Sequence, residues 1–395
     1  MNPPNALEPA LTAQIIQACD ETFDETLRLS KLIHANPELR FEERQAAGWL
    51  SVALEQSGFA LERGLGGLPT AFRGLMARGA GSHVTLLAEY DALEGLGHAC
   101  GHNLIGAMAT GAGLALARVP NWTGTLSVTG CPAEEGGGGK VMLLEAGAFA
   151  GIDAALMIHP FAQNVLAQPF LARAALEVTF HGRAAHAALA PHEGINALDA
   201  ANLFFAGLNA LRQHVTPDVR LHGVIQHGGD APNIIPAQTR LLVVARAARG
   251  EYLFENFLPR VRAVIDGAAL MTGCTVSLRE PVPAYKDVRA NPVLLQLFRE
   301  VSSALGREFV PEKPLESAST DLGNVSHAIP TIHPYYSLGW DAQPHTPEFE
   351  RAAISLEGER CLRDGVRALA ISAATLLTNP QLVADAWHAQ QQALE

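Results

Sequence analysis

Apolar residues first recur with helical spacing and then give way to short apolar runs. Residues 9–35 and 42–57 carry the 3.6-residue periodicity of amphipathic helices, and the second stretch ends at Gly58. An Ala- and Gly-rich helical segment at 104–118 lies among four predicted strands, Ala71–Leu75, Val84–Ala88, Thr125–Thr129 and Ala154–Ile158. Strands that alternate with helices predict a layered α/β domain with a largely parallel sheet.

The pattern changes in the middle of the chain. Strand-like and helix-like segments follow in the order β-α-β-β-α-β, at Ala174–Phe180, Asn196–Val215, Leu221–Gln226, Thr239–Ala245, Glu251–Leu270 and Thr275–Leu278. That order is typical of a small ferredoxin-like α+β domain. Helix and strand alternation resumes after Pro283, and the last ~40 residues are Ala-rich and helical. We therefore predict a first domain of residues 1–172 plus 285–395 and an inserted domain of residues 173–284.

Composition favours a well-packed protein that does not bind nucleic acid. The 395 residues favour two domains, and 48% hydrophobic with 17% charged residues argue against disorder. A net charge of -12 repels phosphate backbones. Five widely spaced cysteines fit a reducing cytoplasm better than a disulfide framework. We expect no signal peptide at the N-terminus and no membrane span, because neither apolar pattern is found.

The loop after the second predicted strand holds a thiol and an imidazole. The sequence LLAEYDALEGLGHACGHNLIGA at 86–107 runs from an apolar strand into acidic residues, then to Cys100 and His102 before a helix. Ligands of open α/β sheets lie beyond the carboxyl ends of the strands, where this loop falls. The pair could therefore serve one site; the alternative is a buried cysteine beside a surface histidine.

A second strand ends at the sequence CPAEEGGGGK, residues 131–140. It is not a phosphate-binding loop, because Lys140 is followed by Val141 and Glu134 stands where that motif needs glycine. Adjacent Glu134 and Glu135 suit a division of labour in which one carboxylate binds metal and the other takes a proton from water. An exposed acidic turn is the alternative.

Two further histidines complete the candidate set. His159 follows an apolar strand in MIHP, and His345 lies in the Pro-bounded loop QPHTPEF. Each alone is more typical of a structural residue, but three strand ends of one sheet together would deliver thiolate, carboxylate and imidazole ligands to one edge. That mixture suits zinc or a similar first-row ion. No G-x-S-x-G or H-E-x-x-H motif supports a serine hydrolase or a single-zinc protease.

These motifs resemble peptidase family M20, the aminoacylase and carboxypeptidase group of di-metal amidohydrolases. The resemblance is strongest to the branch with aminobenzoyl-glutamate hydrolase, hippurate and auxin-conjugate hydrolases and a β-alanyl-lysine-type dipeptidase. The matching segments span most of the chain in the family's order: HANPEL at 34–39, AEYDALEGLGHACGHN at 88–103, PAEEGGGGK at 132–140, MIHP at 157–160, GRAAHAALAPHEG at 182–194, NIIP at 233–236, STDLGNVSHAIPTIHP at 319–334 and HTPEF at 345–349.

The resemblance implies a role for each matching residue. Two divalent ions per chain would be held by Cys100, His102, Glu135, His159 and His345, with the Cys100 thiolate bridging them. Glu134 would be the general base and then the acid for the leaving amine. His186 would polarise the scissile carbonyl in the partner subunit's site, while Asn233 and Arg246 would hold the substrate's carboxylate. The inserted domain would be the surface of a homodimer.

The implied reaction is hydrolysis of the amide bond in a small N-acyl or N-aroyl amino acid or dipeptide by a metal-bound hydroxide. Zinc is favoured by Cys100, while manganese or cobalt fits the carboxylate and imidazoles. One departure is Glu89-Tyr90-Asp91, where many relatives have His-x-Asp; Asp91 either orients a ligating histidine or caps the loop. A deaminase acting on an aromatic amine and a non-catalytic binding protein remain alternative functions.

Overall fold

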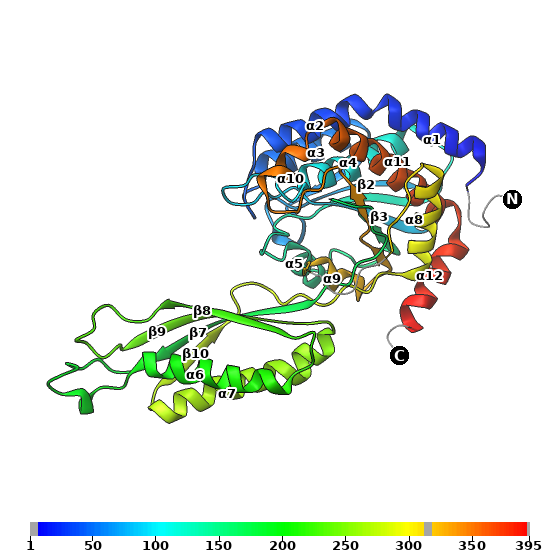
Figure 1. Ribbon diagram of the computed structural model, residues 1–395. Coiled ribbons are helices and arrows are strands. Elements are labelled where there is room, and N and C mark those ends of the chain that lie inside the picture. Colours follow the sequence, from blue (N-terminus) through cyan, green and yellow to red (C-terminus); the bar gives the residue numbers. More distant parts are fainter. Residues whose placement is uncertain (1–6, 312–317, 393–395) are drawn as a thin grey trace. The chain divides into compact units, whose positions relative to one another are not determined.

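The structure is a computed structural model that describes residues 7–311 and 318–392 (Figure 1). The chain forms two compact units, the first made of Met1–Gln168, Arg289–Pro314 and Asn324–Glu395, the second of Pro169–Val288 and Leu315–Gly323. The predicted domain boundaries at 172/173 and 284/285 stay predictions. Part of the N-terminal segment in which no signal peptide is expected, and the last three residues of the C-terminal helical segment, lie outside the described residues.

Unit 1 is built on a mixed six-stranded sheet in the order β1-β2-β4-β3-β5-β11. Its strands are β1 (Ala60–Arg63), β2 (Phe72–Arg78), β3 (His83–Ala88), β4 (Gly124–Gly130), β5 (Ala154–Leu156) and β11 (Thr331–Ile332). The four strands from β4 to β11 are parallel, and β1 and β2 complete one edge with antiparallel pairing. The carboxyl ends of β4, β3 and β5 therefore lie side by side at one edge of the sheet. A small parallel pair, β6 (His159–Phe161) and β12 (Tyr335–Ser337), follows this edge.

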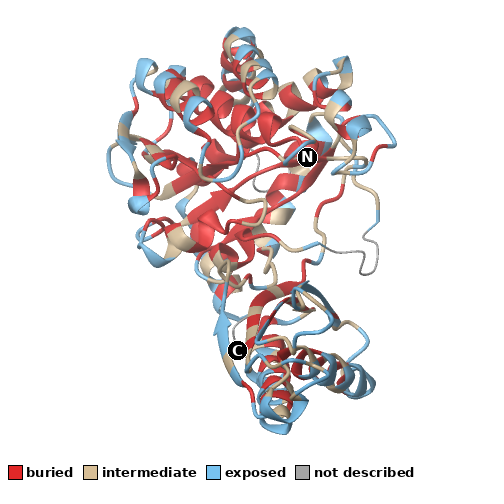
Figure 2. Ribbon diagram, turned by 90° about the vertical axis from the view of Figure 1, so that its left-hand side faces the viewer, coloured by how far each residue is buried: buried red, intermediate tan, exposed pale blue. Residues whose placement is uncertain are grey.

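Helices pack against the sheet and bury its apolar residues. One face is covered by α2 (Phe23–Ala35), α3 (Arg44–Gln56), α4 (His102–Arg118) and α11 (Leu356–Thr378), with α1 (Pro9–Glu21) beyond them (Figure 1). The remaining helices of the unit are α5 (Gly139–Glu145), α8 (Pro292–Ala304), α9 (Leu322–Ser326, which begins in unit 2), α10 (Pro347–Ala352) and α12 (Pro380–Gln392). Figure 2 shows that buried residues fill the sheet and the helix faces against it. No helix within the described ranges has the length and apolar character needed to cross a membrane.

Helix α4 is the centre of this packing. Every residue from His102 to Leu116 is buried, because the helix lies between the sheet and helices α2 and α11. Small residues permit this contact: a Cβ atom on Gly111 would lie 2.6 Å from Thr26 Cγ2 and 3.1 Å from Val366 Cγ2. Because many of its side chains are as small as Ala or Gly, α4 can contact neighbouring elements on all sides and become fully buried.

Unit 2 is a four-stranded antiparallel sheet with helices on one face (Figure 1). The strand order is β10-β7-β9-β8, from β7 (Ala172–His181), β8 (Arg220–His227), β9 (Gln238–Ala247) and β10 (Thr275–Arg279). Helices α6 (Ala197–Leu211) and α7 (Leu258–Thr272) pack on the face that presents alternate apolar residues of β7 and β9. The predicted β-α-β-β-α-β order and the fold class, an α/β unit with a separate α+β unit, are confirmed.

The structure differs from the predicted elements in several places. The periodic stretch 9–35 is two helices, because the chain turns at Thr22 with φ −100° and ψ 0°. Strand β5 ends at Leu156, two residues early. The helix predicted to begin at 251 opens with a π-helical segment, Tyr252–Phe257, ahead of Pro259, whose missing N–H cannot support regular α-helical hydrogen bonding.

The packing of α4 predicts opposite effects for one substitution at two helical glycines. We expect Gly111→Ala to lower the free energy of unfolding by about 1–3 kcal/mol, because the new methyl group overlaps Thr26. Gly48→Ala in α3, where a Cβ atom meets nothing within 4 Å, should instead stabilise by up to ~1 kcal/mol. Denaturant unfolding of both variants measures the difference, and a neutral Gly111→Ala would contradict the tight packing of α4.

Candidate metal centre

Cys100 and His102 are brought to the edge of the sheet by a turn that requires glycine. Gly101 between them has φ +76°, and a Cβ atom there would lie 2.4 Å from Pro160 Cγ. His102 is the first residue of α4, and both side chains are buried. The turn therefore directs the thiol and the imidazole to the carboxyl end of β3, as the sequence predicts.

The His102 ring is oriented by Asp91. His102 Nδ1 lies 2.9 Å from Asp91 Oδ1, so this nitrogen donates its proton to the carboxylate. The other ring nitrogen, Nε2, is buried and has no hydrogen-bond partner among the described residues. Burial lowers the pKa of His102, but Asp91 raises it well above its usual range. This arrangement, a carboxylate behind a histidine, is how proteins fix the tautomer of a metal ligand.

The two glutamates follow β4 on a tight turn. Ala133 has φ +60°, which reverses the chain so that Glu134 and Glu135 follow directly, both half-buried. The backbone N–H of Glu135 donates to Asp91 Oδ2 over 2.8 Å. Asp91 therefore holds a group from each of two neighbouring strand ends, β3 and β4.

His159 follows the third strand end and, like His102, directs its Nε2 atom to the cluster. Its Nδ1 donates to the carbonyl oxygen of Pro160 over 2.7 Å, and its Nε2 lies 3.6 Å from Cys100 Sγ. Burial, followed by the charge of His102, lowers the pKa of His159 to about 4, so the ring is neutral at pH 7. A neutral imidazole with its free lone pair on Nε2 is the form that binds a metal ion.

His345 approaches the group from the Pro-bounded loop before α10. Its backbone N–H donates to the Ala99 carbonyl over 2.8 Å, and its Nε2 lies 3.1 Å from Glu135 Oε1. The hydrogen bond to Glu135 raises the pKa of His345. The residue has φ +66°, a left-handed backbone that is costly for a side chain other than glycine. This conformation is the one that brings the ring to the carboxylate.

The structure thus brings the five predicted ligands and Glu134 into one cluster. Ligand atoms lie within 4.8 Å of one another in each of three sets: Cys100, His102 and His159; Cys100, Glu135 and His345; His102, Glu134 and Glu135. The sets share members, which is the arrangement expected for neighbouring ions with bridging ligands. The Nδ1 atoms of His102 and His159 are both hydrogen-bonded on the side away from the cluster, which leaves Nε2 of each ring facing it, so the residues present fit a divalent-metal centre.

A fully buried ion pair lies beside the cluster. Lys140 Nζ is 2.5 Å from Glu89 Oε1, and Glu89 Oε2 is 3.5 Å from His102 Nε2. Burial raises the pKa of Glu89, but Lys140 lowers it further, to about 2. Glu89 is the position where the resemblance leads one to expect histidine, and its charge is matched by a lysine. Neither residue was part of the predicted site.

A second buried carboxylate, Glu43, supports the glutamate turn. Its Oε1 accepts from the backbone N–H of Ala133 and its Oε2 accepts from Thr70 Oγ1, both over 2.9 Å. Burial and the charge of Asp91 raise the pKa of Glu43 to about 7. Sequence reasoning missed Glu43, because a single Glu beside α3 gives no signal of the contact. For Asp91 the sequence allows either an orienting or a capping role, and its contacts with His102 and Glu135 fit the orienting role.

The remaining predicted residues lie in unit 2. His186 Nδ1 accepts from the backbone N–H groups of Ala188 and Leu189, over 3.3 and 3.1 Å, which leaves the proton on Nε2. His186 forms a β-bridge with Ile234, and Ala187 N–H donates to the Asn233 carbonyl, so His186 and Asn233 lie close together. Arg246 lies half-buried on β9, where its Nη1 donates to Ser319 Oγ over 3.0 Å.

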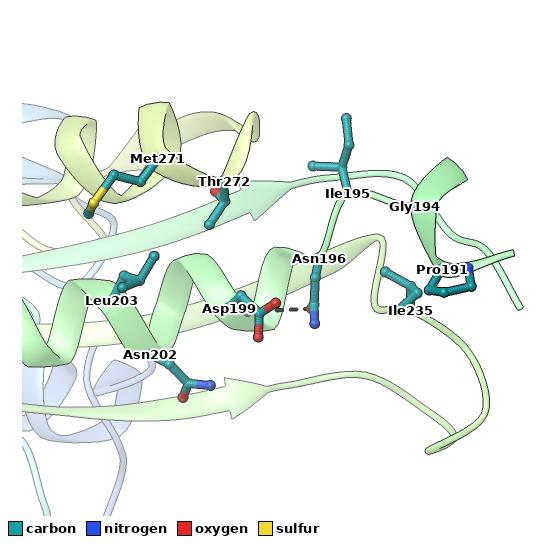
Figure 3. A pocket seen from close by; sticks show the side chains of 10 residues that line it. All are labelled: Pro191, Gly194, Ile195, Asn196, Asp199, Asn202, Leu203, Ile235, Met271 and Thr272. Carbon is teal, nitrogen blue, oxygen red and sulfur yellow. Dashed lines mark hydrogen bonds between the residues drawn. The ribbon is translucent and has the colours of Figure 1, made fainter. Parts of the chain in front are cut away.

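Unit 2 also contains an open groove of about 650 Å³ at one end of α6 and α7 (Figure 3). Its lining includes the α6 cap, Asn196, with Asp199, and apolar side chains such as Leu203, Ile235 and Met271. None of the predicted site residues lines this groove. It is therefore a feature separate from the cluster of ligands in unit 1.

The two hydrogen bonds accepted by Asp91 predict a loss of metal affinity when its charge is removed. We expect Asp91→Asn to weaken divalent-metal binding about 10- to 100-fold, because His102 and Glu135 lose their common support. Calorimetric titration of the metal-free protein measures the change. Asp153→Asn is the control, since Asp153 accepts from His83 N–H at the opposite end of β3. Equal affinities for all three proteins would contradict the orienting role.

The raised pKa of Glu43 predicts a pH-dependent stability difference. The folded protein binds this proton more tightly than the unfolded chain, so the stabilisation is complete below pH ~4.5 and is lost as pH rises through about 7. We expect wild type to lose roughly 3 kcal/mol relative to Glu43→Gln between pH 4.5 and 8. Denaturant unfolding at several pH values measures it, with Glu62→Gln on exposed β1 as control. If the difference in free energy of unfolding between wild type and Glu43→Gln stays constant over this pH range, the pKa of Glu43 is not raised by folding.

Comparison with known proteins identifies the family. Residues 84–373 match the profile of peptidase family M20/M25/M40. The chain is 38% identical to the Xaa-Arg dipeptidase of Mus musculus over 94% of this chain and 90% of that protein. It is 39% identical to one of the subunits of p-aminobenzoyl-glutamate hydrolase from Escherichia coli (strain K12), over 62% of this chain and 55% of that protein.

Solved structures share the fold. The aminobenzoyl-glutamate utilization protein of Klebsiella pneumoniae superposes with a TM-score of 0.74 at 21% identity, covering 91% of this chain and 98% of its own. The YXEP protein of Bacillus subtilis, described as a dinuclear metal binding peptidase from the M20 family, gives 0.69 at 20% identity, covering 91% and 99%. The resemblance seen in the motifs is confirmed, and the chain belongs to peptidase family M20/M25/M40 as a metallohydrolase.

Proposed function

We propose that this protein hydrolyses the amide bond of a small N-acyl or N-aroyl amino acid or a dipeptide. The observation that carries the proposal is the cluster in unit 1, where three strand ends and one loop supply thiol, imidazole and carboxylate groups in three overlapping sets of three, with ligand atoms within 4.8 Å of one another in each set. The names of the relatives support it, since they include dipeptidases and an aminobenzoyl-glutamate hydrolase.

The proposed site holds two divalent ions with Cys100, His102, Glu135, His159 and His345. Zinc is favoured by the thiolate, and manganese or cobalt also fits the oxygen and imidazole ligands. When bound there, the ions would lower the pKa of a water molecule to about 7 and polarise the scissile carbonyl. The orientations of His102 and His159 support this assignment, because the hydrogen bond of each Nδ1 directs Nε2 to the cluster.

Glu134 is the proposed proton carrier of the reaction. It is adjacent to the ligand Glu135 and belongs to the same set of close groups as His102, but it is the carboxylate left over when the five ligands are assigned. From that position it takes a proton from the attacking water and passes it to the departing nitrogen. General acid and base catalysis of this kind contributes about 10²- to 10⁴-fold.

The residues of unit 2 bind and polarise the substrate in this proposal. His186 carries its proton on Nε2, so the ring is set to donate to an oxygen that gains negative charge. Asn233 beside it and Arg246 on β9 hold the substrate's carboxylate. We further propose a homodimer formed through unit 2, in which His186 serves the partner subunit's site.

Removing the proton carrier separates catalysis from metal binding. We expect Glu134→Gln to retain two ions per chain by elemental analysis while turnover falls by about 10²- to 10⁴-fold. Mass spectrometry detects products from N-acyl amino acids, aminobenzoyl-glutamate and β-alanyl dipeptides, with protein loaded in turn with zinc, manganese and cobalt. Glu145→Gln, an exposed carboxylate of α5, is the control. Full activity in Glu134→Gln would refute its role, and no amide cleavage by metal-loaded wild type would refute the function.

A further inference from the structure

Two arginines face each other on the sheet of unit 2. Arg173 of β7 and Arg246 of β9 are direct partners in the antiparallel register. Opposed residues point to the same face with Cβ atoms about 5 Å apart. The residues beside them, such as Ala172 and Ala247, are buried in the core formed with the helices. The two guanidinium groups therefore lie on the other face of the sheet, away from α6 and α7.

Like charges in this arrangement are unfavourable unless a ligand compensates them. Neither arginine forms an ion pair with an Asp or Glu among the described residues. Arg246 Nη1 donates to Ser319 Oγ over 3.0 Å, and the Arg173 guanidinium stacks over the Tyr285 ring at 5.5 Å from its centroid. Arg173 Nη1 is buried and has no hydrogen-bond partner within the part of the chain that the structure describes. This buried donor of a charged group therefore lacks the acceptor that such groups normally have.

The pKa values of neighbouring groups are lowered by burial and by the positive charge of these two arginines. Burial and then Arg173 lower the pKa of Arg246. Burial lowers the pKa of His222 on β8, and Arg246 and Arg173 lower it further. Arg220 also aligns with Arg246, but its Nη1 donates to the backbone carbonyls of Pro217 and Val219. Burial raises the pKa of Asp218, but hydrogen bonds and the charge of Arg220 lower it, so Arg220 has an acidic neighbour. The charges without an ion-pair partner among the described residues are therefore those of Arg173 and Arg246.

We propose that Arg173 is a second substrate-binding arginine and that, with Arg246, it selects amides whose leaving amino acid carries two carboxylates, as in N-acyl aspartates and glutamates. This inference rests on the proposed function, in which Arg246 holds one carboxylate. A single carboxylate leaves one of two half-buried guanidinium groups uncompensated, whereas a dicarboxylate matches both. Stacking on Tyr285 and the bond to Ser319 fix the two groups while N–H edges stay available for paired hydrogen bonds to carboxylates.

The test compares two substrates that differ by one charge. Metal-loaded wild type is assayed with aminobenzoyl-glutamate and aminobenzoyl-glutamine, which have nearly the same shape. We expect kcat/KM to favour the glutamate compound by about 10- to 100-fold, the usual cost of removing one partner of a charged hydrogen bond. In Arg173→Gln this preference should fall to about 1 through a rise of KM for the glutamate compound, with metal content unchanged.

Two further variants separate charge from geometry and from folding. Arg173→Lys keeps the charge but loses the paired N–H groups, so we expect it to retain part of the preference. Arg240→Gln, on the same strand and face as Arg246 but exposed, should leave the preference unchanged. If Arg173→Gln does not fold, the loss is measured in Arg173→Lys. Equal cleavage of the two substrates by wild type, or an undiminished preference in both Arg173 variants, would overturn the inference.

Product binding distinguishes failure of this inference from failure of the proposed function. Calorimetry with free glutamate and free glutamine on metal-loaded protein measures the two-arginine site without any turnover. Stronger binding of glutamate that is lost in Arg173→Gln would support the anion site even if no amide is cleaved. Cleavage of amides together with equal binding of the two amino acids would leave the proposed function intact and refute the role of Arg173.

Discussion

The carboxylate of Asp91 couples two strand ends of unit 1 and sets the geometry of the cluster. One oxygen accepts from His102 Nδ1 and the other from the backbone N–H of Glu135. The first contact directs Nε2 of His102 to the cluster, and the second fixes the turn that carries both glutamates. Because β3 and β4 are parallel neighbours, their ends are close enough for one short side chain to reach both. The other three candidate ligands, Cys100, His159 and His345, lie around this pair.

Glu43 holds the same turn at a second point, the backbone N–H of Ala133. Asp91 accepts the N–H of Glu135 and Glu43 accepts that of Ala133, so alternate amides of the turn are held by buried carboxylates. Buried carboxylates that accept from backbone donors are far less mobile than exposed ones. Glu134 lies between the two held amides and is therefore positioned by this network.

The sequence was sufficient for the fold and for the grouping of candidate ligands, but not for their support. Alternating apolar runs and helices predict parallel strands, and parallel strands gather their carboxyl ends, so Cys100, Glu135 and His159 were expected together. The contacts of Asp91 and Glu43 with the turn join residues 44 and 90 positions apart. These contacts depend on the left-handed backbone of Ala133, which the local amino-acid sequence does not predict. Net charge was equally uninformative about unit 2: a chain at -12 still places two arginines in register on one sheet face.

His345 occupies a left-handed backbone conformation that costs roughly 1–2 kcal/mol for a residue with a Cβ atom. Its ring already lies against Glu135, and its amide is bonded to Ala99. The strained backbone and the ring contact thus belong to one residue. Replacing His345 with glycine would relieve the backbone cost and remove the imidazole at the same time.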